Sequence, residues 1–164
     1  MIGGRILDAD AVASAITGRL MYARALVAAA ATQGNVIVIL CAALVGGLAR
    51  VPDGVRRQGA AVLLAVPVVV VEPLDQDRAV PLAELMAAAR PPSGDLVTAA
   101  VVLSARRRGW PIVSGRAREL LALDAAVEID RLPRPAPPPI SPPAPVACIR
   151  RPQPARSPRP CAWW

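Results

Sequence analysis

Residues 5–12 read Arg5-Ile6-Leu7-Asp8-Ala9-Asp10-Ala11-Val12, a short apolar run that ends at an aspartate and leads into an Ala-rich stretch. The apolar run predicts a buried strand, and the pattern from about Ala11 predicts a helix. Asp8 therefore stands at the carboxyl end of the first strand, which is where parallel α/β sheets bind ligands. Asp8 could instead cap the following helix, a role that Asp10 would fill equally well.

Short strands and helices alternate from this point to residue 132. Apolar, mostly β-branched runs predict further strands at 36–40, 66–72, 110–114 and 127–129. Helical patterns lie between them at 21–32, 41–50, 54–65, 77–90, 95–108 and 116–123. Because strands separated by helices require crossover connections, we predict a three-layer α/β/α fold with a central parallel sheet.

The chain changes character after Leu132. Residues 133–164 contain 12 of the 19 prolines, five arginines and no acidic residue. A segment with this composition cannot bury a hydrophobic core, so we expect it to be disordered or extended. We therefore divide the chain into an α/β domain, residues 1–132, and a Pro/Arg-rich tail, residues 133–164. Most of the net charge of +7 belongs to that tail and does not indicate nucleic-acid binding by the domain.

Composition excludes several classes of site. All 19 basic residues are arginine, so His-based triads, His-ligated zinc, Schiff-base lysines and the Walker A lysine are ruled out. The three cysteines lack metal-ligand spacing, and no secretion signal is evident, which predicts a reduced, cytoplasmic protein. The longest apolar stretch, 36–49, has about 14 residues where a membrane span needs ~20, so we expect no membrane association.

Asp95 is the second candidate site residue. It follows Ser93-Gly94 and opens the helical pattern at 95–108. An acid at that position and Asp8 at a strand end can converge above a parallel sheet, and we expect them to meet near Ser114, within reach of one divalent metal ion. The alternative is that Asp95 has a structural role only, as the N-cap of its helix.

At this point the chain resembles PIN-domain proteins, the nuclease fold of many toxin–antitoxin ribonucleases. The resemblance rests on the stretches 6–12, 94–100, 108–115 and 120–129, taken in their order, and covers about residues 4–132. It implies a cluster of three or four carboxylates that holds Mg²⁺ or Mn²⁺ for phosphodiester hydrolysis. Asp8 and Asp95 match two of these acids and would serve as catalytic residues and metal ligands. The other two positions fall at Leu44-Val45-Gly46-Gly47 and at Ser114-Gly115, where no acid stands.

Two functions follow from this resemblance. The first is a metal-dependent ribonuclease, the toxin of a toxin–antitoxin pair, with RNA as substrate, an antitoxin protein as partner and a homodimer as a further expected state. The second is a catalytically inactive PIN-like module that binds a partner. A third interpretation comes from Asp8-Ala9-Asp10-Ala11-Val12, which also resembles the nucleophile motif of haloacid-dehalogenase-type phosphatases, although the lysine of that family is absent.

Two charged runs complete the candidates. Arg106-Arg107-Arg108 ends a predicted helix, where arginines favour the helix dipole, and an alternative role is contact with RNA phosphates. Glu72, Asp75 and Asp77 follow the third predicted strand, and we expect them to form an exposed acidic loop.

Overall fold

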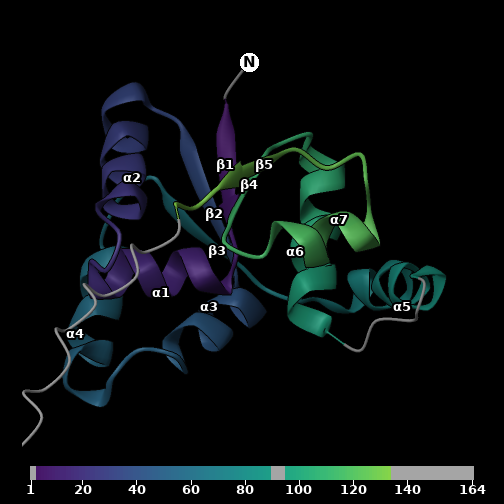
Figure 1. Ribbon diagram of the computed structural model, residues 1–164, viewed down its shortest axis with the longest axis horizontal. Coiled ribbons are helices and arrows are strands. Elements are labelled where there is room, and N and C mark those ends of the chain that lie inside the picture. The colour runs from purple at the N-terminus through teal and green to yellow at the C-terminus, as the bar shows by residue number, and fades with distance from the viewer. Residues whose placement is uncertain (1–2, 90–94, 134–164) are drawn as a thin grey trace, which may run out of the picture.

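Five parallel strands form one sheet in the order β3-β2-β1-β4-β5 in the computed structural model (Figure 1). The strands are β1 (Gly4–Leu7), β2 (Val36–Leu40), β3 (Val69–Glu72), β4 (Ile112–Ser114) and β5 (Ile129–Arg131). Helices cover both faces of this sheet. The predicted three-layer α/β/α fold with a central parallel sheet is confirmed.

The structure describes residues 3–89 and 95–133. The predicted Pro/Arg-rich tail, apart from its first residue, lies outside these ranges. Across 3–89 and 95–133, no helix has both the length and the apolar character that crossing a bilayer requires.

Two groups of helices sandwich the sheet. One layer contains α1 (Ala9–Thr17), α2 (Met21–Gln33) and α4 (Asp53–Leu64), and the other contains α5 (Ala79–Ala88), α6 (Leu96–Arg108) and α7 (Ala117–Leu123). Helix α3 (Cys41–Leu48) follows β2 directly and packs against both α1 and α6. A single 3₁₀ turn, η1 (Gln76–Arg78), precedes α5. The carboxyl ends of the strands therefore open between α1, α3 and α6.

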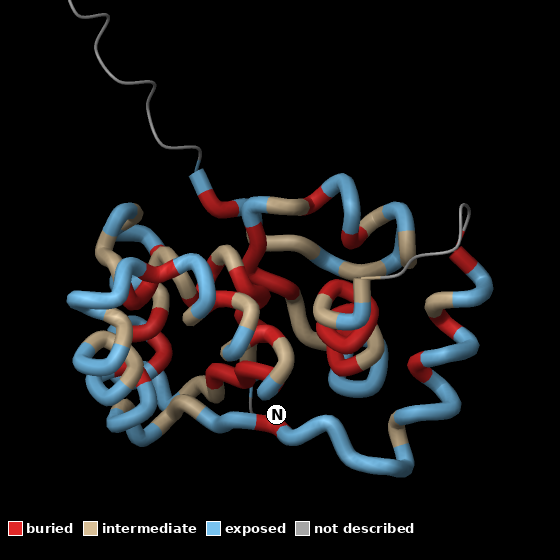
Figure 2. The backbone as a smooth tube through the Cα atoms, turned by 90° about the horizontal axis from the view of Figure 1, so that it is seen from below, coloured by how far each residue is buried: buried red, intermediate tan, exposed pale blue. Residues whose placement is uncertain are grey.

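Strand β1 lies at the centre because it pairs with β2 on one side and β4 on the other, so that Ile6 faces both Val38 and Ile112. Successive side chains point to opposite faces of a strand. Leu7 accordingly packs in the core beneath α1, α2 and α4, whereas Ile6 packs in the core beneath α5, α6 and α7. Both faces are covered, which explains why β2 is apolar throughout and why Ile6 and Leu7 of β1 are fully buried; the centre of the molecule is accordingly coloured as buried in Figure 2.

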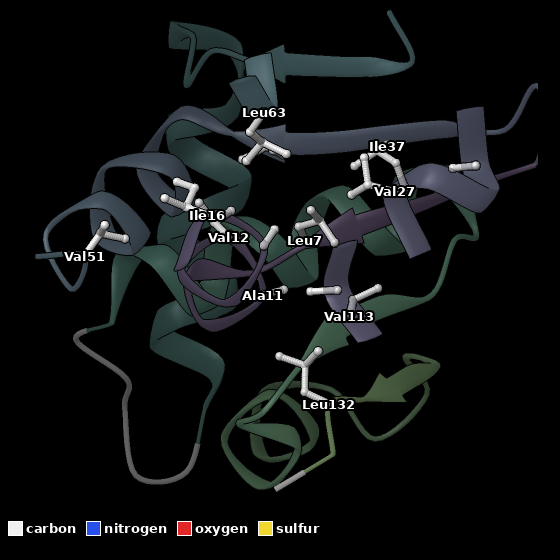
Figure 3. Packing of buried hydrophobic residues seen from close by; sticks show 14 residues of the cluster. Leu7, Ala11, Val12, Ile16, Val27, Ile37, Val51, Leu63, Val113 and Leu132 are labelled. Carbon is white, nitrogen blue, oxygen red and sulfur yellow. The ribbon is translucent and has the colours of Figure 1, made fainter. Parts of the chain in front are cut away.

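Helix α1 packs unusually close to its neighbours through two glycines. A Cβ atom at Gly47 of α3 would stand 2.7 Å from Val12, and one at Gly59 of α4 would stand 2.4 Å from Ile16. No larger residue fits at either point, so these glycines fix how near α3 and α4 come to α1. Figure 3 shows Val12 and Ile16 within the resulting core, together with Leu7, Leu63 and Val113.

The predicted boundaries were wrong by two residues or more at three strands. The fourth begins at Ile112, after Pro111, rather than at 110. The third strand begins at Val69 rather than at 66, because Pro67 has no backbone N–H and the Val69 N–H instead closes a turn on the Val66 carbonyl at 2.9 Å. The last strand runs over 129–131 rather than 127–129. There the Asp124 carboxylate accepts from the Ala126 N–H at 2.9 Å, and this turn delays the start of the strand.

Candidate functional site

Asp8 lies between β1 and α1 and is only 1% exposed. Its Oδ1 accepts a hydrogen bond from the Ala11 N–H at 2.9 Å, which is the N-cap bond of α1. Its Oδ2 accepts from the hydroxyl of Ser114, the last residue of β4. Asp8 is therefore the N-cap of α1, as the capping alternative predicted, and it also joins the carboxyl ends of two neighbouring strands. Its role in ligand binding stays a prediction.

Asp95 precedes α6 and caps it, as the capping interpretation predicted. Its Oδ1 accepts from the backbone N–H groups of Val97 and Thr98 at 3.1 and 3.2 Å. The Thr98 hydroxyl donates to its Oδ2. These contacts leave the carboxylate half-exposed and directed toward the strand ends, because α6 begins beside α3.

The side chain of Arg116, just before α7, brings the predicted residues together. Its Nη1 donates to Asp95 Oδ2 at 3.1 Å, and its Nε lies 4.0 Å from Asp8 Oδ2. The same Nε lies 3.7 Å from Asp10 Oδ2. Asp8 and Asp95 therefore approach each other beside Ser114, as expected, and they do so across one guanidinium group.

Asp10 is held from two sides. Arg50, which follows α3, forms an ion pair with Asp10 Oδ1, while Arg116 approaches its Oδ2. Neither arginine was a candidate from the sequence. With 19 arginines and no other basic residue, nothing in the local pattern distinguishes these two. Only the β1–β4 pairing carries Arg116 to residues more than 100 positions away.

The three groups at the centre have shifted pKa values with distinct causes. Burial raises the pKa of Asp8, and the hydrogen bonds from Ser114 and Ala11 offset only part of that effect. Burial also raises the pKa of Asp95, but hydrogen bonds from Thr98 and Arg116 outweigh it, and the net pKa is lowered. Burial disfavours the charged form of Arg116, yet the nearby Asp8 and Asp95 carboxylates raise its pKa. Arg116 is thus a permanent positive charge within the cluster.

The two glycines that stand where the resembled family carries acids both lie beside this cluster. A Cβ at Gly46 would meet the Cβ of Ala9 at 3.4 Å and the side chain of Val97 at 3.8 Å, and these are the neighbours of Asp8 and of α6's first residue. A Cβ at Gly115 would meet Asp10 Oδ2 at 3.3 Å. Carboxylates at positions 46 and 115 would therefore extend the acidic cluster.

The present residues do not fit a divalent metal ion. Magnesium requires oxygen ligands at about 2.1 Å in near-octahedral array. Here the guanidinium of Arg116 fills the space between the carboxylates of Asp8 and Asp95. Within the described part of the chain, no group of three or more His, Cys, Asp or Glu side chains is placed to hold a metal.

The prediction of an exposed acidic loop was wrong for Glu72. This residue is 8% exposed and ends β3, where its carboxylate pairs with Arg78 and Arg108 and accepts from the Ser104 hydroxyl at 3.1 Å. Asp75 and Asp77 are exposed, as predicted. Two arginines of the 106–108 run also have structural partners: Arg108 pairs with Glu72 and Arg106 pairs with Asp124.

A second feature is an apolar groove of about 640 Å³ between α1, α2 and α4. Nine of its lining residues are aliphatic: Ala15, Ile16, Val27, Ala28, Ala31, Val55, Val62, Leu63 and Val66. Val62 is 65% exposed and Val55 is 45% exposed. The close approach of α4 to α1 at Gly59 forms one wall. Sequence periodicity did not reveal this groove, because it depends on how three separate helices meet.

Comparison with known proteins gives a fold relationship. Neither a protein-family model nor a curated protein matches the sequence. Among solved structures, this chain superposes on a chain of VapBC2 from Rickettsia felis, in a complex bound to a promoter DNA fragment, with a TM-score of 0.63. The two chains are 12% identical, and the match covers 79% of this chain and 99% of that chain. A chain of FitAB bound to an IR36 DNA fragment gives a TM-score of 0.49 and 14% identity, with coverages of 77% and 94%. The VapBC2 match shows a shared fold over nearly the whole of that chain, which agrees with the predicted PIN-like architecture.

Proposed function

We propose that this chain is a PIN-like domain of the toxin–antitoxin class that acts by binding a protein partner through the groove between α1, α2 and α4. The observation that carries the proposal is the groove itself, which is lined by aliphatic side chains from three helices and leaves several of those on α2 and α4 exposed. The fold shared with a chain of VapBC2 supports the class. This function needs no intact metal site, which accords with the arginine at the centre of the acidic cluster.

The expected partner is an antitoxin-like protein that presents an amphipathic helix. A groove walled by helices and lined by small aliphatic residues accepts the apolar face of such a helix, with anchors spaced three or four residues apart. The exposed part of Val62 would then become buried. Burial of aliphatic surface contributes about 25 cal/mol per Å², so a charge placed in the groove should weaken binding strongly.

The test uses the full chain co-expressed with candidate antitoxin-like proteins, drawn from small reading frames that adjoin its gene. Size-exclusion chromatography and calorimetry should show a complex that Val62→Asp weakens at least tenfold. Val80→Asp is the matched control, because Val80 is a 66% exposed valine on α5, in the opposite helix layer. Equal binding by both variants and the parent chain would refute the groove, and absence of any complex would refute the proposed partner.

A second candidate function is metal-dependent hydrolysis of RNA, with Asp8 and Asp95 as catalytic residues and Mg²⁺ or Mn²⁺ as cofactor. This function requires the metal to displace Arg116 from between the two carboxylates. The convergence of these two carboxylates on one guanidinium favours it, because it places them at a common site. Such activity should require the metal, stop with EDTA and be lost in Asp8→Asn, which removes the charge while keeping the shape. RNA cleavage that survives both treatments would come from a contaminant.

The glycine positions sharpen this second test. Gly46→Glu and Gly115→Asp restore negative charge beside Asp8, Asp95 and Asp10, so they should raise cleavage if the chain is a weakened ribonuclease. Gly46→Glu also improves helix propensity, and its stability must be measured separately. No cleavage by the double variant would leave the binding module as the function. Nothing in the comparisons supports the phosphatase alternative, and the homodimer stays a prediction.

A further inference from the structure

The geometry points to Arg116 as a built-in cation that occupies the acidic cluster in place of a divalent metal ion. This inference does not depend on the groove or its partner. The guanidinium lies within 4.0 Å of carboxylates from four residues: Asp8, Asp10, Asp95 and Glu119. They come from the start of α1, the start of α6 and the first turn of α7. One cation thus links three elements around the carboxyl ends of β1 and β4.

The position of Arg116 is fixed at both ends of the residue. Its backbone N–H donates to Ser114 Oγ at 2.8 Å, and the same hydroxyl donates to Asp8. At the other end, Nη2 donates to the Thr98 hydroxyl at 3.1 Å. The side chain is 23% exposed. These anchors distinguish Arg116 from a solvated surface arginine and hold its charge inside the cluster.

The Nε atom shows that this is not an ordinary bidentate ion pair. It is buried and has no hydrogen-bond partner, although oxygens of Asp8, Asp10 and Glu119 lie 3.6–4.0 Å from it. A structural arginine usually satisfies its N–H groups in a fork that matches one carboxylate. Arg116 instead sits as a central charge among several carboxylates, which is the electrostatic role of a metal ion. Because guanidinium and metal would fill the same space, they exclude each other.

Removing the guanidinium should therefore create a divalent cation site. Arg116→Gln removes the positive charge that lies among the four carboxylates, including the buried Asp8, and uncompensated charge at a buried carboxylate is strongly unfavourable. A small dication such as Mn²⁺ restores that charge and accepts carboxylate oxygens. In the parent chain, Mn²⁺ must first displace an anchored arginine, so binding should be much weaker.

The experiment titrates MnCl₂ into the full chain and four variants, followed by calorimetry and by thermal unfolding against NaCl of equal ionic strength. Arg116→Gln should bind one Mn²⁺ at least tenfold more tightly than the parent chain, and its Tm should rise with Mn²⁺ but not with NaCl. Arg116→Lys, which keeps a positive charge, and Arg118→Gln, which removes an exposed arginine two residues away, should behave like the parent. Adding Asp95→Asn to Arg116→Gln should abolish the gain.

Two outcomes would overturn the inference: equal Mn²⁺ affinity in the parent chain and in Arg116→Gln, or no specific Mn²⁺ binding by Arg116→Gln. If Arg116→Gln is unfolded without metal, circular dichroism replaces the thermal measurement. Mn²⁺ should then restore the helical signal where NaCl does not, and failure to recover it counts against the inference. Nucleolytic activity has no part in these measurements.

Discussion

Two buried carboxylates stand at strand ends of the same sheet, and they are compensated in opposite ways. Glu72, at the end of β3, is shared by two arginines and a serine hydroxyl. Asp8, after β1, also accepts from a serine hydroxyl but shares the single Arg116 with other carboxylates. At Glu72, two arginines surround one carboxylate. At Arg116, four carboxylates surround one guanidinium.

The pKa values follow this difference. Burial raises the pKa of Glu72, but its hydrogen bonds with Arg78 and Arg108 outweigh burial and lower the net pKa. Burial raises the pKa of Asp8, and its partners do not compensate. A buried acid with an arginine nearby is thus not in itself a sign of function. The cluster around Asp8 is the better indicator of function, because it concentrates negative charge at a cost to stability.

The largest expected effect is at Glu72. Glu72→Gln leaves Arg78 and Arg108 without their shared counter-ion, and breaking such a partly buried network should cost about 2 kcal/mol of unfolding free energy. Urea denaturation measures this. Asp77→Asn removes an exposed acid in the same segment and should change stability by less than ~0.5 kcal/mol. A cost at position 77 equal to that at 72 would mean that local charge, and not the buried cluster, matters.

The second-largest effect is the pH dependence of the unfolding free energy, which should have opposite signs for Glu72 and Asp8. The pKa of Glu72 is lowered by folding, so its stabilising contribution is present above the ordinary glutamate pKa and is lost as pH falls through the folded value. The stability gap between the parent chain and Glu72→Gln should therefore shrink by roughly 1 kcal/mol or more as pH falls from 7 to below 4. Urea denaturation across that range tests it, and a gap independent of pH would contradict the ion-pair assignment.

Asp8→Asn should have a smaller effect of the opposite sign. The pKa of Asp8 is raised by folding, so its contribution to stability is present at low pH and lost as pH rises through the folded value. Asparagine is a good N-cap and carries no charge to bury, so the variant should gain about 1 kcal/mol at pH 7. The gain should vanish toward pH 4. A loss of stability at neutral pH would show that the pair with Arg116 outweighs burial.

The smallest change in stability is expected for Arg108, one of the two arginines that pair with Glu72. Arg108→Gln removes one partner of Glu72 and the contact of its guanidinium with the Trp110 ring, 5.3 Å from the ring centroid, and should cost about 0.5–1 kcal/mol. The neighbouring Arg107 is exposed, and Arg107→Gln should leave stability unchanged within ~0.3 kcal/mol. Thermal unfolding of the two variants side by side provides the comparison.

Sequence patterns predicted the sheet and the convergence of Asp8 with Asp95 because both depend on local periodicity and on one topological rule. A strand followed by a helix sets the direction of each strand, and parallel strands end at the same edge. The compensation of the charges was not predictable in the same way. Glu72 meets Arg108, and Asp8 meets Arg116, only through strand order and helix packing, so these two partners could not be distinguished among 19 arginines.

The central position of β1 also bears on how the chain is made. During synthesis, β1 can pair with β2, and β2 with β3, once residues 3–72 are available, whereas the other edge of β1 waits for β4 at 112–114. In that interval β1 is an unpaired edge that a second nascent chain could occupy, so strand exchange at this edge is the characteristic route of misassembly. The acidic cluster needs Ser114 and Arg116, so it cannot be complete before residue 116 has been synthesised.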